Sequence, residues 1–106
     1  MTVLNNKEDY KKLMENEFVV IDFFADWCGP CKLVSSYVEK VADTYKDKVS
    51  IVKLNIENED LKEIVSQHNV RSIPTILFIH KNEIKEYVNG AISQKTFTEK
   101  VEKLIQ

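Results

Sequence analysis

Two patterns of apolar and polar residues take turns along this chain of 106 residues. In one pattern, apolar residues run on for about the length of a buried strand; in the other, they recur every three or four positions. The first pattern predicts strands and the second predicts amphipathic helices. Taken in order, the predicted elements are a short edge strand at 3–4, a helix over about 7–15, a strand at 18–24, a helix that follows Pro30 and ends near 45, a strand at 49–56, a helix that starts at 57–60, strands at 75–79 and 84–88, and a helix that begins after Ser93.

This order, β-α-β-α-β-α-β-β-α, is typical of an α/β protein. Strands that alternate with helices are expected to pair in parallel, and the closing hairpin, which turns at Lys81 and Asn82, adds an antiparallel edge. We therefore expect a mixed, mainly parallel five-stranded sheet with helices on both faces. No linker or repeat divides the chain, so residues 1–106 are predicted to form a single domain.

The stretch 18–32 differs from every other strand and helix of the chain. Its buried run is interrupted only by Asp22, and it ends in two cysteines, Cys28 and Cys31, separated by Gly29 and Pro30. After Cys31 the pattern becomes helical. The residues predicted to share the buried face of that helix are Leu33, Val34, Tyr37, Val38, Val41, Ala42 and Tyr45. The two thiols therefore lie where a buried strand turns into a helix.

That position favours redox chemistry. The start of a helix leaves backbone N–H groups unpaired and carries a positive partial charge, which stabilises a thiolate and lowers the thiol pKa. Two intervening residues allow the thiols to close a small disulfide ring, and Pro30 suits a first helical turn because its missing N–H is no loss there. We expect Cys28 to be the attacking sulfur and Cys31, one turn further in, to be the resolving sulfur.

Two other interpretations of the cysteine pair remain open: the cysteines could supply two of the ligands of a metal site, or they could be an inert structural pair. A structural zinc site normally needs four protein ligands, and only His68 and His80 could complete such a set. Neither histidine has ligand spacing, and both are expected to be ordinary surface residues. We therefore expect no metal and no cofactor.

Asp22 and Lys53 are charged residues within otherwise buried strands. A buried carboxylate costs several kcal/mol unless it is paired or protonated, so Asp22 is either a hydrogen-bonded structural residue or a carboxyl with a raised pKa. In the second case it would exchange a proton with Cys31 through water, because a buried thiol is a poor nucleophile until it is deprotonated. Lys53 could reach Asp22 from the adjacent strand and tune it, or its stem could carry the charge to solvent.

Trp27 and Pro74 also stand at predicted turns. Trp27 is outside any periodic segment, so we expect a partly exposed lid beside the cysteines rather than a core residue. Pro74 could simply begin a strand in the trans form, as most X-Pro bonds do.

Composition narrows the class of protein. The net charge of −2 gives no electrostatic case for nucleic acid or a membrane surface, and no apolar run approaches the length of a membrane span. Two closely spaced cysteines do not suit a secreted disulfide scaffold, and the first residues show no signal-peptide pattern. We expect a cytoplasmic monomer.

The segment 25–32, read as Ala-Asp-Trp-Cys-Gly-Pro-Cys-Lys, resembles the active site of the thioredoxin family. Asp22, Lys53, the Ile-Pro-Thr segment 73–75 and Gly90 also fall where thioredoxins have their counterparts, so the resemblance covers essentially the whole chain. It implies a thioredoxin fold and a protein-disulfide reductase that a thioredoxin reductase restores. It also implies that Pro74 is cis and faces the cysteines, and that Gly90 keeps the surface flat for a client peptide. The client-binding residues expected from it are Trp27, Gly29, Pro30, Ile73, Pro74 and Gly90.

Three positions depart from the usual family pattern. Ser36 replaces a frequent proline that kinks the active-site helix, Phe24 replaces a frequent tryptophan, and Asn82 replaces a glycine. Alternative functions are a glutaredoxin-like enzyme that uses glutathione, an oxidant or isomerase of an exported compartment, and a binding module without turnover. The Gly29-Pro30 pair, the lack of a paired-glycine motif near Gly90 and the lack of a targeting signal argue against the first two. The intact cysteines argue against the third.

Overall fold

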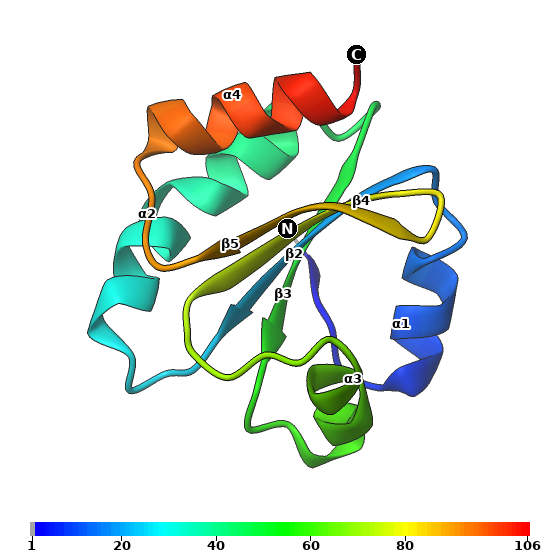
Figure 1. Ribbon diagram of the computed structural model, residues 1–106, viewed down its shortest axis with the longest axis vertical. Coiled ribbons are helices and arrows are strands. Elements are labelled where there is room, and N and C mark those ends of the chain that lie inside the picture. The colour runs from blue at the N-terminus through cyan, green and yellow to red at the C-terminus, as the bar shows by residue number, and fades with distance from the viewer. Residues whose placement is uncertain (1) are drawn as a thin grey trace.

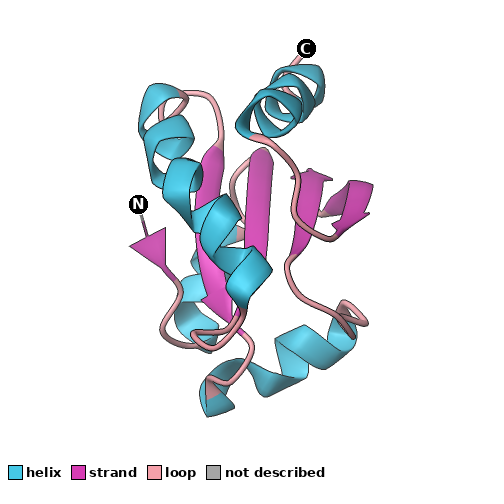
Figure 2. Cartoon of the chain, turned by 90° about the vertical axis from the view of Figure 1, so that its left-hand side faces the viewer, coloured by secondary structure: helices cyan, strands magenta, loops and turns pink. Residues whose placement is uncertain are grey.

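The predicted order of strands and helices is confirmed in the computed structural model, which describes residues 2–106 (Figures 1 and 2). The strands are β1 (Thr2–Val3), β2 (Phe18–Phe24), β3 (Ser50–Asn55), β4 (Thr75–His80) and β5 (Glu83–Asn89). The helices are α1 (Lys7–Leu13), α2 (Gly29–Thr44), α3 (Lys62–Gln67) and α4 (Gln94–Leu104), with a short 3-10 helix, η1 (Glu59–Leu61), just before α3.

Side-chain caps mark where α1 and α4 begin. The side chain of Asn6 accepts a hydrogen bond of 2.9 Å from the Asp9 N–H at the start of α1, and Ser93 caps α4 through the Thr96 N–H at 3.2 Å. Each cap satisfies a backbone donor that the helix itself leaves unpaired. The described helices include none that is long and apolar enough to cross a membrane.

The five strands form one mixed sheet in the order β1-β3-β2-β4-β5, with β2 at its centre. β3 runs parallel to both β1 and β2, as predicted. β4 lies on the other side of β2 and is antiparallel both to β2 and to β5. The predicted fold class, a mixed five-stranded sheet with helices on both faces, is confirmed.

The expected parallel pairing of β4 with the earlier strands is wrong. Its register places Thr75 opposite Phe23 and His80 opposite Phe18, so β4 starts at the end of the sheet where β2 finishes. A parallel crossover must return the chain along the whole sheet, about 20 Å for six residues. α3 has six residues and spans only about 9 Å, so it leaves the chain near the end that β3 has reached.

Helices cover both faces of the sheet, α2 and α4 on one and α1 and α3 on the other, and each pair closes its own apolar core (Figure 1). β2 contributes to both cores because side chains alternate along a strand. Val20 packs in the core under α2 and α4. Ile21 and Phe23 pack in the core under α1 and α3, and both are completely buried.

The predicted buried face of α2 is right except at its first position. Val34, Val38 and Val41 are buried, but Leu33 is 53% exposed. Successive residues of a helix are about 100° apart, so Leu33 lies beside the stripe that the three valines define. Because α2 begins at the cysteines, the displaced leucine is an exposed apolar side chain two residues beyond Cys31.

Two backbone positions take the left-handed conformations that their turns require. Lys81 and Asn82 have φ of 49° and 68°, and together they make the two-residue turn between β4 and β5. Such turns match the twist of the flanking strands, and asparagine tolerates this region better than most residues. Asn82 thus adopts the left-handed conformation for which a glycine is usual at this position.

Candidate active site

Cys28 and Cys31 meet at the start of α2, as the sequence predicts. They form a disulfide with their Cα atoms 5.3 Å apart. Cys28 is the N-cap residue, and its sulfur accepts a hydrogen bond of 3.2 Å from the backbone N–H of Cys31. Gly29 and Pro30 occupy the first positions of the helix, where an absent proline N–H costs nothing.

The N-terminus of α2 favours negative charge on the Cys28 sulfur. A helix of sixteen residues presents unpaired N–H groups and a positive partial charge at this end, and the described first turn of α2 carries no acidic side chain. Once the disulfide is reduced, the N–H that already points at the Cys28 sulfur is positioned to stabilise a thiolate there. This arrangement suits Cys28 to the attacking role.

The two cysteines are almost equally buried. Cys28 is 4% exposed and Cys31 is 2% exposed. Both pack with Phe24 and Ala25 at the end of β2. What distinguishes the two cysteines is their position on the helix, because Cys28 caps it and Cys31 lies within its first turn.

Asp22 is completely buried, and neither of its carboxylate oxygens has a hydrogen-bond partner in the described chain. It shares a face of β2 with Phe24, the residue that packs on the cysteines. Burial raises the pKa of Asp22 from 3.8 to about 7, and the positive charge of Lys53 opposes that rise. A carboxyl with such a pKa can both accept and release a proton near neutral pH.

Lys53 lies directly opposite Asp22 in the parallel pairing of β2 and β3, but the two side chains form no ion pair. Its ammonium instead donates a hydrogen bond of 2.8 Å to the hydroxyl of Ser35 on α2. It also stands 4.2 Å from the centre of the Phe24 ring, a cation–π arrangement. Sequence reasoning missed Ser35, which looks like any other polar residue beside the buried stripe of α2.

Trp27 is 67% exposed beside Cys28, so it lies on the surface and not in the core. Its indole N–H donates a hydrogen bond of 3.0 Å to Glu57, in the turn after β3. The bond fixes the ring against a second loop while leaving most of it open to solvent. A held aromatic surface of this kind is a common anchor in protein contacts.

The Ile73–Pro74 peptide bond is cis. The Pro74 carbonyl accepts a hydrogen bond of 2.8 Å from the Gly90 N–H, which joins the two loops, and Gly90 has φ of 97°. Thr75 is completely buried, and its hydroxyl donates to the Ser72 carbonyl at 2.6 Å. In the described chain the backbone N–H and C=O of Ile73 have no hydrogen-bond partner.

The two histidines lie away from the cysteines. His80 contacts Glu17 at 3.1 Å and stacks on Phe18 at the other end of β2. His68 is not the plain surface residue we expected, because it is half-buried and its Nε2 lies 2.8 Å from the Tyr10 hydroxyl. Nowhere in residues 2–106 do three His, Cys, Asp or Glu side chains gather as a metal site would require.

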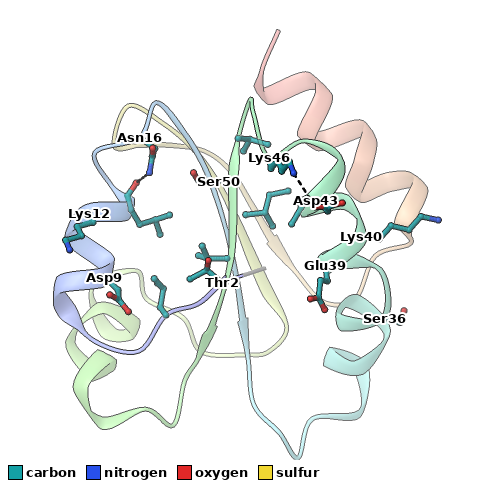
Figure 3. A pocket seen from close by; sticks show the side chains of 16 residues that line it. Thr2, Asp9, Lys12, Asn16, Ser36, Glu39, Lys40, Asp43, Lys46 and Ser50 are labelled. Atoms are coloured by element: carbon teal, nitrogen blue, oxygen red, sulfur yellow. Dashed lines mark hydrogen bonds and ion pairs between the residues drawn. The ribbon is translucent and has the colours of Figure 1, made fainter.

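Four hollows of the surface lie away from the disulfide. They range from about 310 to about 910 Å³, and within the described part of the chain none of the four is lined by Cys28, Cys31 or Trp27. The largest lies between α1 and α2 beside β3 and carries charges of both signs (Figure 3). A site for a small molecule is usually concave, whereas this disulfide meets the surface outside these hollows.

Known proteins resemble this chain throughout. A thioredoxin M-type protein of the chloroplast from Spinacia oleracea is 39% identical over 94% of this chain, which spans 55% of that relative. Thioredoxin 1 from Nostoc sp. is 35% identical over 80% of this chain and 78% of its own length. The thioredoxin structure from Malassezia sympodialis superposes with a TM-score of 0.88 at 28% identity, covering 100% of this chain and 91% of that one.

The family-level match has the same extent. The family model named Thioredoxin matches residues 1–103, so it contains every predicted site residue from Asp22 to Gly90. The chain spans little more than half the length of the spinach relative, so the match describes this domain and not the whole of that protein. On the strength of the family model and these relatives, the chain belongs to the thioredoxin family.

Proposed function

We propose that this chain is a thiol-disulfide oxidoreductase that reduces disulfide bonds in client proteins and is itself restored by a thioredoxin reductase. The observation that carries the proposal is the Cys28–Cys31 disulfide at the start of α2, where a backbone N–H already points at the Cys28 sulfur. Family membership supports it independently.

The proposed reaction has two exchanges. The Cys28 thiolate attacks one sulfur of a client disulfide, the client S–S bond breaks, and the other client sulfur leaves as a thiolate that takes up a proton. Cys31 then loses its proton to Asp22 through water and attacks the Cys28 sulfur. The mixed disulfide breaks, the second client sulfur leaves as a thiolate that is protonated in turn, and the Cys28–Cys31 disulfide forms. Two electrons have passed to the client, and the reductase supplies the next two.

The surface around the disulfide suits an extended peptide. The backbone N–H and C=O of Ile73, which have no partner within the described residues, can hydrogen-bond a client main chain, and such bonds give affinity without demanding a particular side chain. Exposed apolar side chains flank the cysteines along the chain, Trp27 before Cys28 and Leu33 after Cys31. Gly90, beside Pro74, adds no side chain to this surface. We assign client binding to Trp27, Gly29, Pro30, Ile73, Pro74 and Gly90.

The experiment is insulin reduction, followed as turbidity when the reduced chains precipitate. With dithiothreitol as electron donor, the parent protein should accelerate precipitation, and Cys28→Ser should not. Tyr10→Phe, which changes the opposite face of the sheet, serves as the matched control and should keep the parent rate. A parent protein no faster than buffer would overturn the proposal.

The electron donor is tested in the same assay. NADPH with a thioredoxin reductase should support insulin reduction, and glutathione with glutathione reductase should not. Activity with glutathione alone would favour the glutaredoxin-like alternative, and tight client binding without turnover would favour a binding module. None of the four hollows described above is lined by the cysteines, which favours a protein client over a small thiol.

Cytoplasmic location and a monomeric state are part of the same proposal. A dithiol that donates electrons needs a reducing compartment, and the cytoplasm provides one. The spinach relative is named chloroplastic, so fractionation of cells that express the native gene is the direct test of location.

A further inference from the structure

We propose that Ser35 is a positioning residue for the proton transfer at Cys31, because its hydroxyl holds the Lys53 ammonium near Asp22 without letting the two charges pair. The role in proton transfer rests on the proposed function. The effect of Ser35 on Asp22 does not, and it can be measured without any client protein.

Three elements meet at this arrangement. Asp22 of β2 and Lys53 of β3 are opposite one another in register, and their side chains point to the face of the sheet that α2 covers. Ser35 reaches down from α2 and accepts the Lys53 hydrogen bond at 2.8 Å. The Phe24 ring supports the same ammonium at 4.2 Å. Lys53 is therefore held at two points, and neither is Asp22.

In the described chain, Asp22 forms no hydrogen bond that would compete with Lys53 for its carboxylate. Both of its oxygens are buried without a hydrogen bond in the described chain. Among the described residues, the groups that interact electrostatically with it are Lys53 from β3 and Tyr37 from α2, and Cys31 packs on Phe24, which lies on the same face of β2. The neighbour of Asp22 on β4, Ile76, is apolar. Lys53 is the one cation among these groups, so its position decides how strongly the carboxylate is stabilised.

The distance between the two charges controls proton exchange. A direct ion pair with a buried carboxylate strongly favours its ionised form and lowers its pKa. A carboxylate stabilised in this way would accept the proton of Cys31 less readily. The hydrogen bond from Lys53 to Ser35, which we call the tether, keeps the ammonium out of a direct ion pair, so it attracts the Asp22 carboxylate only through space. This weaker attraction opposes the effect of burial on the pKa of Asp22 but does not cancel it. Asp22 then remains able to take up and release a proton near pH 7.

Loss of the tether should let the charges pair. In Ser35→Ala the ammonium keeps its place over Phe24 but loses the one hydrogen-bond acceptor that it has among residues 2–106. The Asp22 carboxylate, on the residue opposite Lys53 in the register, is an acceptor without a hydrogen-bond partner in the described chain. We therefore expect Ser35→Ala to lower the pKa of Asp22 from about 7 to about 6 or below.

The test is an NMR titration of the Asp22 side-chain carboxyl carbon in the oxidised protein. Ser35→Thr keeps a hydroxyl and should keep the parent pKa. Ser36→Ala is the matched control, because Ser36 is the neighbouring serine on the exposed side of α2 and its hydroxyl donates to the Leu33 carbonyl. It should leave the pKa of Asp22 unchanged.

A double-mutant cycle separates positioning from a general effect on α2. Lys53→Met alone should raise the pKa of Asp22, because the opposing positive charge is gone. In the Lys53→Met background, Ser35→Ala should have no effect on that pKa. The proposal is overturned if Ser35→Ala leaves the pKa of Asp22 unchanged, raises it, or lowers it equally without Lys53.

The result of the pKa titration can be interpreted whether or not the proposed function is correct. If insulin is not reduced but Ser35→Ala lowers the pKa of Asp22, the proposed function fails and the tether holds. If insulin is reduced but the pKa does not respond, the tether fails and the function holds. With both intact, the pH profile of the resolving step in Ser35→Ala should move to lower pH with the pKa of Asp22.

Discussion

The side chains on the two faces of β2 have different roles, although they project from the same strand. Ile21 and Phe23 point into the core under α1 and α3, where they are completely buried among mainly aliphatic side chains. Asp22 and Phe24 point to the α2 face, where a buried carboxylate without a partner precedes the ring that packs on the cysteines. Because side chains alternate along a strand, neighbouring residues of β2 belong to different faces, one that stabilises the fold and one that carries the candidate site.

The difference shows how a small domain can carry a costly group. Burying a carboxylate without a partner opposes folding, and a domain of this size has a net stability of only about 5–15 kcal/mol. The α1 and α3 face offsets that cost with a core whose buried residues are apolar. If this division is correct, changes on the first face should alter stability alone, and changes on the second should alter stability and chemistry in opposite directions.

The largest effect on stability is expected at Phe23. Phe23→Ala removes a completely buried ring and should lower the free energy of unfolding by about 3–5 kcal/mol. Urea unfolding followed by circular dichroism measures it. Phe23→Leu, which leaves less empty space, should cost less and keep the parent rate of insulin reduction per folded molecule. A loss of that rate in folded Phe23→Leu would break the division between the faces.

Asp22→Asn should have the opposite sign. The pKa of Asp22 is raised from 3.8 to about 7, so the folded state holds its proton where the unfolded state has lost it. Stability therefore falls as pH rises from about 4 to about 7. Removing the ionisable group should stabilise the protein by roughly 2–4 kcal/mol at pH 7 and by less at pH 5.

The same variant should impair the chemistry. Without a group to accept the Cys31 proton, client reduction at pH 7 should slow by about tenfold or more. Urea unfolding at pH 7 and pH 5 and the insulin assay measure the two effects. A variant less stable than its parent at pH 7 would contradict the buried carboxyl with a raised pKa.

The smallest effect is expected at Tyr10, on the stabilising side. Tyr10→Phe removes the hydroxyl that lies 2.8 Å from Nε2 of His68 and should cost about 0.5–1.5 kcal/mol. Burial lowers the pKa of His68, so the unprotonated ring is the form that folding favours. The variant should reduce insulin at the parent rate, and a slower rate would link this face to the site.

The hydrophobic pattern predicts most strands and helices well because the central strands and the main helices each contribute residues to a buried core. It does not predict the direction of β4, which depends on how far the short α3 carries the chain in space. Leu33 belongs to the same helical pattern as its neighbours, yet it lies at the edge of the stripe, where the sheet does not cover it.

The cysteines and Asp22 could be found in the sequence because their residue types conflict with their surroundings. A charge in a buried run and two thiols at a helix start each demand an explanation. Ser35 gives no such signal, since a serine beside an apolar stripe is ordinary. Its importance comes from a contact across 18 residues of sequence to Lys53, which only the packing of α2 on the sheet reveals.

The most direct test of the account is the trapping of mixed disulfides with a client. Cys31→Ser keeps the first exchange and removes the sulfur that resolves it, so this variant should accumulate a covalent adduct with insulin. Cys28→Ser lacks the sulfur at the N-cap of α2 and should accumulate little or none. Non-reducing electrophoresis followed by mass spectrometry measures both. Equal trapping by the two variants, or trapping by Cys28→Ser alone, would contradict the assignment of attack to Cys28.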